Sequence, residues 1–274
     1  MMVNSNNKII TAPNIILERT SKRVSDFIDA ADNLNNIKGN NKLIQALRVF
    51  DNIMESENVW PFIQAFFPTI GGTAFSHKFN MVNPLLYEIT FPAAYIHTLS
   101  GIKHNGTVGA IATSSFAFGD LTYNDTHLLF AELEGLHSTG VAVGFVNDYD
   151  LVNRMLIHPR YTDEKHYSDH YSGTTNRMSY VNDNSLGVYL SQRSSANYAE
   201  TRKNGVIKST NTNASSGTVP SNYLLKIGNT ELVGTESIYT PRFSCIGIGK
   251  SMPNAQAIGY SRAVEALLKC CEKK

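Results

Sequence analysis

The residues best suited to binding chemistry gather between His158 and Tyr171, in the string HPRYTDEKHYSDHY. Its tyrosines offer flat rings that can stack on the faces of sugars, and its arginine and aspartates can hydrogen-bond to sugar hydroxyls. Tyrosine suits protein interfaces equally well, so sugar contact, subunit contact and a plain exposed loop are all open interpretations. The candidate contact residues are Arg160, Tyr161, Asp163, Tyr167, Asp169 and Tyr171.

The same string also holds the best candidates for metal ligands, because neutral imidazoles together with carboxylates can bind zinc or nickel. His166 and His170 have the spacing that brings two ligands together on a helix, but the residues around them do not favour a helix. On a strand, side chains four residues apart lie ~13 Å from each other, too far to bind one ion. We therefore expect no metal here, and an aromatic, polar loop or edge strand instead.

The sequence carries no recognisable catalytic motif. The nearest approach to a glycosidase pair is Glu132-Leu133-Glu134, whose carboxylates would lie about 7 Å apart on one side of a strand, whereas a retaining pair flanks the scissile bond at ~5 Å. There is no Gly-x-Ser-x-Gly motif, and the string GIGKS at 247–251 lacks the first glycine of a phosphate-binding loop. We expect a protein that is not an enzyme and needs no cofactor.

Composition and charge exclude several function classes. Charged residues make up 17% of the chain, aromatic residues make up 10%, and there are 27 asparagines, a balance that suits strands and polar turns. The net charge of +1 gives no electrostatic footprint for nucleic acid or an anionic membrane. Because the sequence lacks a signal-peptide core and any apolar run of ~18 residues, we expect synthesis in a cytoplasm.

Residues 1 to 24 are predicted to form an extended anchoring arm. They are rich in Asn, Ser and Lys, and two short apolar runs lie on either side of Pro13. Such a segment cannot bury enough surface by itself to offset the entropy of ordering it, so we expect neighbouring molecules to hold it. The anchoring residues are Ile9, Ile10, Ile15, Ile16 and Leu17.

Residues 25 to 70 are predicted to be helical. Over 41–54 the apolar residues recur at intervals of three and four, with an asparagine at the start as the candidate cap. A second helix is expected over about 60–67, because Pro61 suits its first turn and Pro68 is a residue at which a helix stops.

Residues 71 to 274 are predicted to form a β-sandwich closed by a C-terminal helix. The chain changes here to short β-branched and aromatic runs separated by Gly, Asn, Asp and Ser, the pattern of a sandwich or barrel. The strongest hairpin signal is at 203–206, because Asn204-Gly205 supplies the two positive φ angles of a type I′ turn. From Asn254 to Cys271 apolar residues recur at helical spacing and form one face, which predicts a helix packed on the sandwich.

Several short motifs, in order along residues 25 to 270, resemble those of structural proteins of tailed bacteriophages. They include FIDAA at 27–31, PTIGGTAFSHKFNMVNP at 68–84, NDTHL at 124–128, KNGV at 203–206 and FSCIGIG at 243–249. The resemblance implies a mainly β fold, an antiparallel jelly-roll sandwich of the concanavalin A-like, laminin G-like type, with an N-terminal helical segment and a C-terminal helix. It also implies display on a virion, in a tail, fibre or head-fibre position, and it does not imply a catalytic site.

The leading interpretation is a virion structural protein, assembled in the host cytoplasm, whose partners are capsid, tail or fibre subunits and not nucleic acid or membrane. Because fibre proteins are commonly trimeric, we expect a homo-trimer. A host surface glycan is the candidate ligand, although lectin-like sandwiches serve sugar binding, protein contact and scaffolding alike. Two alternatives stay open: a free-standing carbohydrate-binding lectin module, which a signal peptide would favour, and a glycan-cleaving hydrolase, which paired carboxylates on one strand would favour.

Overall fold

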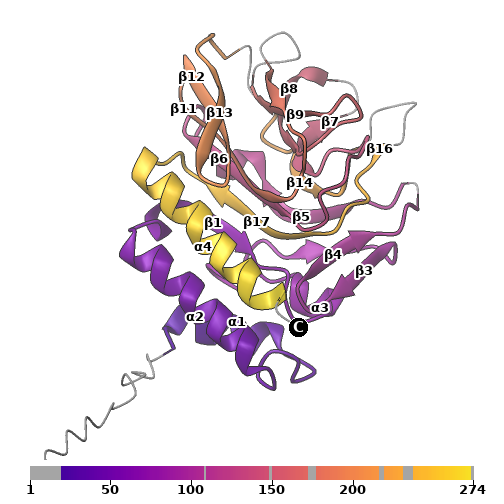
Figure 1. Ribbon diagram of the computed structural model, residues 1–274, viewed down its shortest axis with the longest axis vertical. Coiled ribbons are helices and arrows are strands. Elements are labelled where there is room, and N and C mark those ends of the chain that lie inside the picture. The colour runs from indigo at the N-terminus through magenta and orange to yellow at the C-terminus, as the bar shows by residue number, and fades with distance from the viewer. Residues whose placement is uncertain are drawn as a thin grey trace, which may run out of the picture.

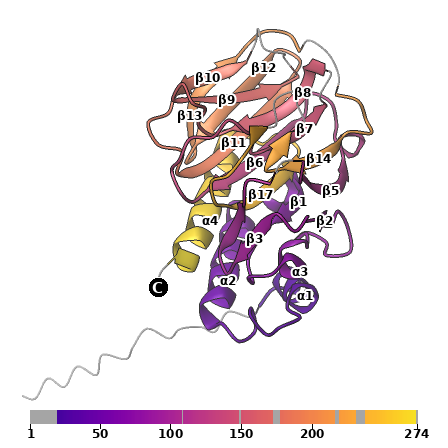
Figure 2. The ribbon, with the colours of Figure 1, turned by 90° about the vertical axis from the view of Figure 1, so that its right-hand side faces the viewer.

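A computed structural model of the chain consists of two antiparallel β-sheets packed face to face, with helices on the outer face of one sheet (Figures 1 and 2). The structure describes residues 20–107, 109–147, 150–171, 177–215, 219–230 and 237–272.

The first sheet, sheet A, has the strand order β13-β12-β11-β6-β17-β4-β3, and β1 also pairs with β17. Neighbouring strands run antiparallel. Several pairs join segments that are far apart in the sequence, such as residues 63–67 and 126–132 with residues 243–249. Its strands are β1 (Ile63–Phe67), β3 (Tyr95–Thr98), β4 (Gly101–His104), β6 (Thr126–Glu132), β11 (Gly187–Ser195), β12 (Tyr198–Lys203), β13 (Val206–Asn211) and β17 (Phe243–Gly249).

The second sheet, sheet B, has the strand order β10-β9-β8-β7-β14-β5-β2. Its strands are β2 (Ile89–Thr90), β5 (Ala112–Ala117), β7 (Val143–Asn147), β8 (Asp150–His158), β9 (Lys165–His170), β10 (Met178–Val181) and β14 (Leu224–Ile227). The short strands β15 (Asn229–Thr230) and β16 (Ser237–Ile238) pair with each other.

The first two helices are amphipathic and begin after residues suited to capping. The side chain of Ser21 accepts a hydrogen bond at the start of α1 (Lys22–Ala31), and that of Asn40 does so at the start of α2 (Asn41–Ser56). The chain also forms α3 (Ala74–His77), α4 (Asn254–Glu272) and the 3₁₀ turns η1 (Trp60–Phe62) and η2 (Phe118–Asp120). Figure 1 shows α4 lying along sheet A with α2 packed beside it.

Two apolar layers follow from the alternation of side chains along the strands of sheet A. Leu128 and Phe130 of β6 point into the core between the sheets, whereas Leu129 and Ala131 point into a second core shared with the helices. Sheet A is therefore covered on both faces, and its buried strands carry continuous apolar runs.

The predicted fold class is confirmed: the chain is a mainly β, antiparallel sandwich with helices before it and a helix at its C-terminal end. The predicted helix over 60–67 is wrong beyond its first turn, because Ile63–Phe67 form β1 and pair with β17. The segment predicted to be helical thus contributes a strand to the sandwich. Helix α1 also begins at Lys22, inside the segment predicted as an arm.

Candidate functional site

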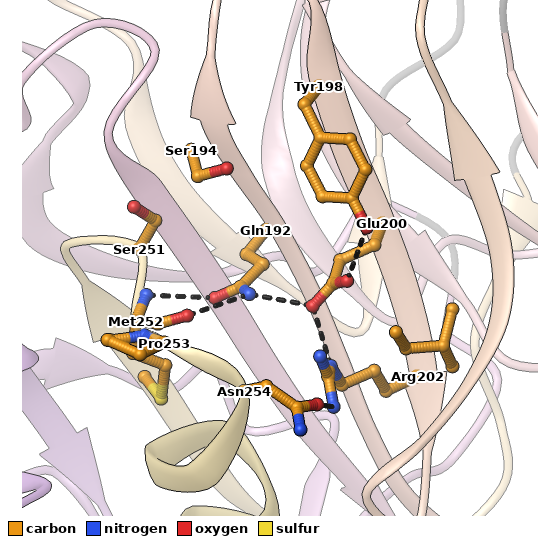
Figure 3. Close-up of a pocket in the computed structure, with 10 residues that line it drawn as sticks. Gln192, Ser194, Tyr198, Glu200, Arg202, Ser251, Met252, Pro253 and Asn254 are labelled. Atoms are coloured by element: carbon orange, nitrogen blue, oxygen red, sulfur yellow. Dashed lines mark hydrogen bonds and ion pairs between the residues drawn. The ribbon is translucent and has the colours of Figure 1, made fainter.

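A cleft of about 470 Å³ lies on the outer face of sheet A, beside the first residue of α4. Strands β11, β12 and β13 form its floor and one wall, and the turn leading into α4 forms the other wall (Figure 3). The lining residues are Gln192, Ser194, Tyr198, Glu200, Arg202, Ile207, Ser251, Met252, Pro253 and Asn254.

The pairing of β11 with β12 positions the floor. Gln192 lies opposite Glu200 in the register, and alternation along β12 places Arg202 on the same face as Glu200. The intervening Thr201 points the other way and meets His166 of sheet B. The sandwich therefore presents three long polar side chains on a face that otherwise packs against helices.

Glu200 is the centre of a closed hydrogen-bond network in the cleft. Its Oε1 accepts from Gln192 Nε2 at 2.7 Å and from Arg202 Nε at 2.6 Å, and its Oε2 accepts from the Tyr198 hydroxyl at 2.9 Å (Figure 3). Gln192 in turn bonds both backbone atoms of Met252, accepting from its N–H and donating to its carbonyl, each at 3.0 Å.

Arg202 ties the floor to the helix. Its Nη1 donates to the Gly205 carbonyl at 3.1 Å and to Asn254 Oδ1 at 2.8 Å. Because the ion pair with Glu200 is almost fully buried and each partner has further hydrogen bonds, the geometry of the floor is fixed before any ligand arrives. A prearranged polar floor is a property of binding sites.

The rim of the cleft combines apolar and polar groups. The Tyr198 ring is half-buried, and Ile207 is 42% exposed. Ser194 and Asn254 are exposed, and Ser251 is half-buried, so hydroxyl and amide groups surround the opening. Glu200 is the only carboxylate among the lining residues, and it is held in an ion pair, so this cleft does not offer the two carboxylates that glycoside hydrolysis uses.

The residues of this cleft were not predicted from the sequence. The available signal was a polar residue on the helix-covered face of a predicted strand, as at Gln192 after the apolar Val188 and Leu190. The other wall of the cleft comes from residues 251–254. These residues reach β11 and β12 because of the path that the chain takes through β17.

The predicted contact string covers the β8–β9 connection and strand β9 of sheet B, and four of its candidates lie near the surface. Tyr161 and Tyr167 have ring centroids 6.2 Å apart, and the Tyr167 hydroxyl donates to Asp163 at 2.5 Å. Arg160 pairs with Glu164 at 3.1 Å. These residues form a small, partly exposed aromatic and polar group, which we call the β8–β9 turn cluster: Arg160, Tyr161, Asp163 and Tyr167.

The other two candidates are buried, which corrects the prediction. Asp169 is fully buried between Arg154 Nε, at 2.6 Å, and the guanidinium of Arg177, at 2.7 and 2.8 Å. Tyr171 is fully buried in the core between the sheets, with its hydroxyl 2.6 Å from Thr126 Oγ1. Neither side chain presents a surface to a glycan.

The histidines of β9 point into the sandwich and are bound to hydroxyls of sheet A. His166 Nε2 lies 3.0 Å from Thr201 Oγ1, and His170 Nδ1 lies 3.1 Å from Ser191 Oγ. The residues that the structure describes contain no cluster of three or more side chains suited to holding a metal ion. Strand β9 itself lies between β8 and β10, so the predicted loop or edge strand is an inner strand.

Glu132 and Glu134 have separate partners. Glu132 is buried and accepts from the hydroxyls of Ser185, at 2.5 Å, and Tyr239. Burial raises the pKa of Glu132 to about 7, against the opposing effect of these hydrogen bonds. Glu134 instead pairs with Lys103 at 3.0 Å.

The predicted anchoring residues Ile9, Ile10, Ile15, Ile16 and Leu17 lie outside the described residues. Among the helices of the described segments, none has the length and apolar character needed to cross a bilayer.

No protein-family model matches the chain, and no curated protein matches its sequence. Solved structures do match. A mutant of HCR/D is 9% identical with a TM-score of 0.52, over 73% of this chain and 52% of that one. Domain 4 of AbnA, an extracellular arabinanase from Geobacillus stearothermophilus in complex with arabinotriose, is 12% identical with a TM-score of 0.49, over 73% and 98%. A Trypanosoma rangeli sialidase in complex with sialic acid is 10% identical with a TM-score of 0.47, over 80% and 38%.

The chain therefore spans about half of the HCR/D structure and less than two fifths of the sialidase. At these identities a likeness shows the fold alone. The class that the fold defines is an antiparallel β-sandwich protein, and its function has to be argued from its own surface.

Proposed function

We propose that this chain is a non-catalytic, carbohydrate-binding β-sandwich carried on the particle of a tailed bacteriophage, as a fibre, head-fibre or tail accessory component. The observation that carries the binding part is the cleft beside α4, in which a fixed polar floor of Gln192, Glu200 and Arg202 lies below the Tyr198 ring. The virion part rests on the sequence motifs that resemble phage structural proteins.

The chemistry of the cleft suits a sugar. A sugar ring presents hydroxyls that both donate and accept, and an apolar face that packs on aromatic rings. Glu200 supplies an acceptor, Arg202 and Asn254 supply donors, and Tyr198 supplies the ring. Binding in so open a cleft would be weak for one copy, and many tethered copies on a particle would raise the overall affinity by effective concentration.

A glycan array with matched tyrosine variants tests the binding site. We expect Tyr198→Ala to abolish the binding seen with the unmodified protein, because it removes the stacking ring. Tyr161→Ala, in the β8–β9 turn cluster on the other sheet, is the matched control and should bind as the unmodified protein does. If Tyr161→Ala loses binding and Tyr198→Ala keeps it, the glycan binds at the β8–β9 turn cluster and not in the cleft. An unmodified protein that binds no glycan, free or on particles, would overturn the binding proposal.

The arm at residues 1 to 24 supplies the test of the virion part. A chain that lacks residues 1 to 19, which keeps Ser21 and the whole of α1, should fold but fail to join the particle, because the apolar runs at 9–10 and 15–17 are proposed to bind capsid, tail or fibre neighbours. We also propose a homo-trimer, which the mass of the purified protein in solution checks. If the protein is absent from purified particles, the proposal of a virion component is wrong and the alternative of a free-standing lectin module is favoured.

The non-enzyme part is tested separately. Purified protein should release no reducing ends from host polysaccharide, since Glu132 and Glu134 are held by different partners. A release that Glu132→Gln or Glu134→Gln abolishes would overturn it in favour of a glycan-cleaving hydrolase.

A further inference from the structure

The side-chain charges that line the cleft cancel. Arg202 is the only cation and Glu200 the only anion among its lining residues, all of which the structure describes. The two are joined at 2.6 Å, and each side chain is 3% exposed. A ligand that enters therefore meets one cationic and one anionic side chain whose net charge is zero.

Each partner of the pair keeps hydrogen-bonding capacity that the protein does not use. Arg202 spends Nε on Glu200 and Nη1 on Gly205 and Asn254, while Nη2 donates to no group in the described part of the chain. Among the described residues, Glu200 Oε2 accepts from Tyr198 alone, so it has room for a second donor. A donor and an acceptor side by side match two adjacent hydroxyls of a sugar ring, one accepting and one donating.

An acidic sugar fits these charges less well. Its carboxylate would gain from Nη2 of Arg202, and from the start of α4 at Asn254, which carries the equivalent of about half a positive charge. It would also have to approach the carboxylate of Glu200, whose side chain is 3% exposed and therefore poorly screened by water, so the two like charges repel. The carboxylate of Glu200 therefore works against anions.

We infer that the cleft selects an uncharged sugar residue, with Glu200 Oε2 and Arg202 Nη2 binding adjacent hydroxyls and Tyr198 packing on the ring face. The inference rests on the proposed carbohydrate-binding function and adds the class of sugar and the residues that determine it. Glu200 is the residue that determines specificity against acidic glycans.

The first test uses the unmodified protein with uncharged oligosaccharides and with sialylated and uronic acid oligosaccharides. We expect the uncharged probes to bind at least about tenfold more tightly, a difference of about 1.4 kcal/mol. Their dissociation constants should change less than about twofold between low and high salt, because no net charge is neutralised. Tighter binding of the acidic probes would overturn this inference and leave the proposed function standing, whereas binding of neither class would count against the function itself.

The second test converts the specificity. Glu200→Gln keeps an acceptor oxygen for Arg202 but leaves the cleft with a net positive charge, so acidic probes should gain affinity, and this gain should fall with salt. The matched control is the double variant Glu200→Gln, Arg202→Gln, which restores neutrality and should lose the gain. If Glu200→Gln does not fold, the salt and probe comparisons on the unmodified protein decide. A folded Glu200→Gln variant without any gain for acidic probes would contradict the assigned role.

Discussion

Glu132 is a buried carboxylate that forms no ion pair with any residue that the structure describes. It accepts from Ser185, Tyr239 and the backbone N–H of Leu136, at 3.2 Å for the last. Burial still dominates and raises its pKa from the ordinary value of 4.5 to about 7. The folded state therefore binds this proton more tightly than the unfolded state does.

We expect Glu132 to make the protein less stable as the pH rises from about 4.5 through about 7, because its contribution is complete below the unfolded pKa and is lost through the folded one. Glu132→Gln, which mimics the protonated acid, should remove this loss, worth up to about 3 kcal/mol. Urea denaturation at several pH values measures it, with Glu134→Gln as the control. If the free energy of unfolding changes with pH equally in Glu132→Gln and in the unmodified protein, Glu132 does not have a raised pKa in the folded state.

The hydroxyl of Tyr260 lies against Gly247 in the core between sheet A and the helices. A Cβ on Gly247 would overlap the Tyr260 hydroxyl and lie 3.0 Å from Cζ of that ring. The hydroxyl itself is buried and makes no hydrogen bond in the described structure, which costs stability.

Gly247→Ala should therefore destabilise the protein by about 1 to 3 kcal/mol through overpacking. Tyr260→Phe alone should be neutral or stabilising, and the double variant should recover part of the loss, because the ring edge stays close. Thermal unfolding of the three variants gives the coupling. A double variant no more stable than Gly247→Ala would show that the hydroxyl is not the obstacle.

At the scale of elements, the β12–β13 hairpin has the turn that its sequence predicts. Lys203 pairs with Val206, which leaves a two-residue loop, and Asn204 and Gly205 have φ angles of 51° and 77°. The Asn204 side chain also accepts from the Val188 N–H at 2.8 Å, so the turn holds β11 as well. The same hairpin carries Arg202, and so it helps to place the floor of the cleft.

We expect Asn204→Ala or Gly205→Val to lower stability by about 1 to 3 kcal/mol, because both replacements disfavour the left-handed backbone. At Gly205 the nearest atom to an added Cβ is 3.6 Å away, so its cost is conformational and not a clash. Val206→Ala, at a side chain that is 57% exposed, is the control and should change stability by less than about 0.5 kcal/mol. Unchanged melting temperatures for the turn variants would show that the left-handed backbone of this turn does not limit stability.

Local signals predicted some elements and missed others for physical reasons. Helices α2 and α4 follow from spacing of three and four residues, which is a local property. The stretch 63–67 is apolar enough for a buried helix or a buried strand, and what decides is its pairing with β17, about 180 residues later. A single sequence does not show such a non-local partner.

The candidate sites were predictable only in part for a related reason. Alternation along β9 separates Tyr167 from His166 and Ser168, but it does not show that Asp169, on the same face as Tyr167, is covered by Arg154 and Arg177. The cleft beside α4 needs β11, β12 and residues 251–254 together. Tertiary packing, and not residue type, decides which polar groups stay accessible.

At the scale of the whole molecule, the sandwich keeps several histidines in its interior. Burial lowers the pKa of His77 and His166 to about 3 and that of His127 and His158 to about 4, and it lowers that of His170 well below its ordinary value. His166 and His170 on β9 point into the sandwich and bind hydroxyls of sheet A, whereas His127 on β6 lies on the helix-covered face of sheet A, against Tyr260. The packing of the two sheets thus depends on His166 and His170 remaining neutral, and the packing of the helices on sheet A depends on His127.

We expect the protein to lose stability as the pH falls below about 6.5, the unfolded pKa of histidine, and to go on losing it toward pH 3 to 4. A depressed folded pKa means that unfolding takes up protons, so the free energy of unfolding rises with pH over this range. Glu132 acts in the opposite direction between about pH 4.5 and about pH 7, but five histidines outweigh one carboxylate, so stability should rise with pH and level off above about pH 7. Denaturant titrations in small pH steps measure the slope, and its value divided by 2.303RT gives the number of protons taken up. Repeating them with Glu132→Gln separates the two effects, since removing the opposing contribution of Glu132 should make the rise in the free energy of unfolding between about pH 5 and about pH 7 steeper. A free energy of unfolding that stays constant from about pH 7 to about pH 5 would show that these histidines do not stay neutral in the folded state.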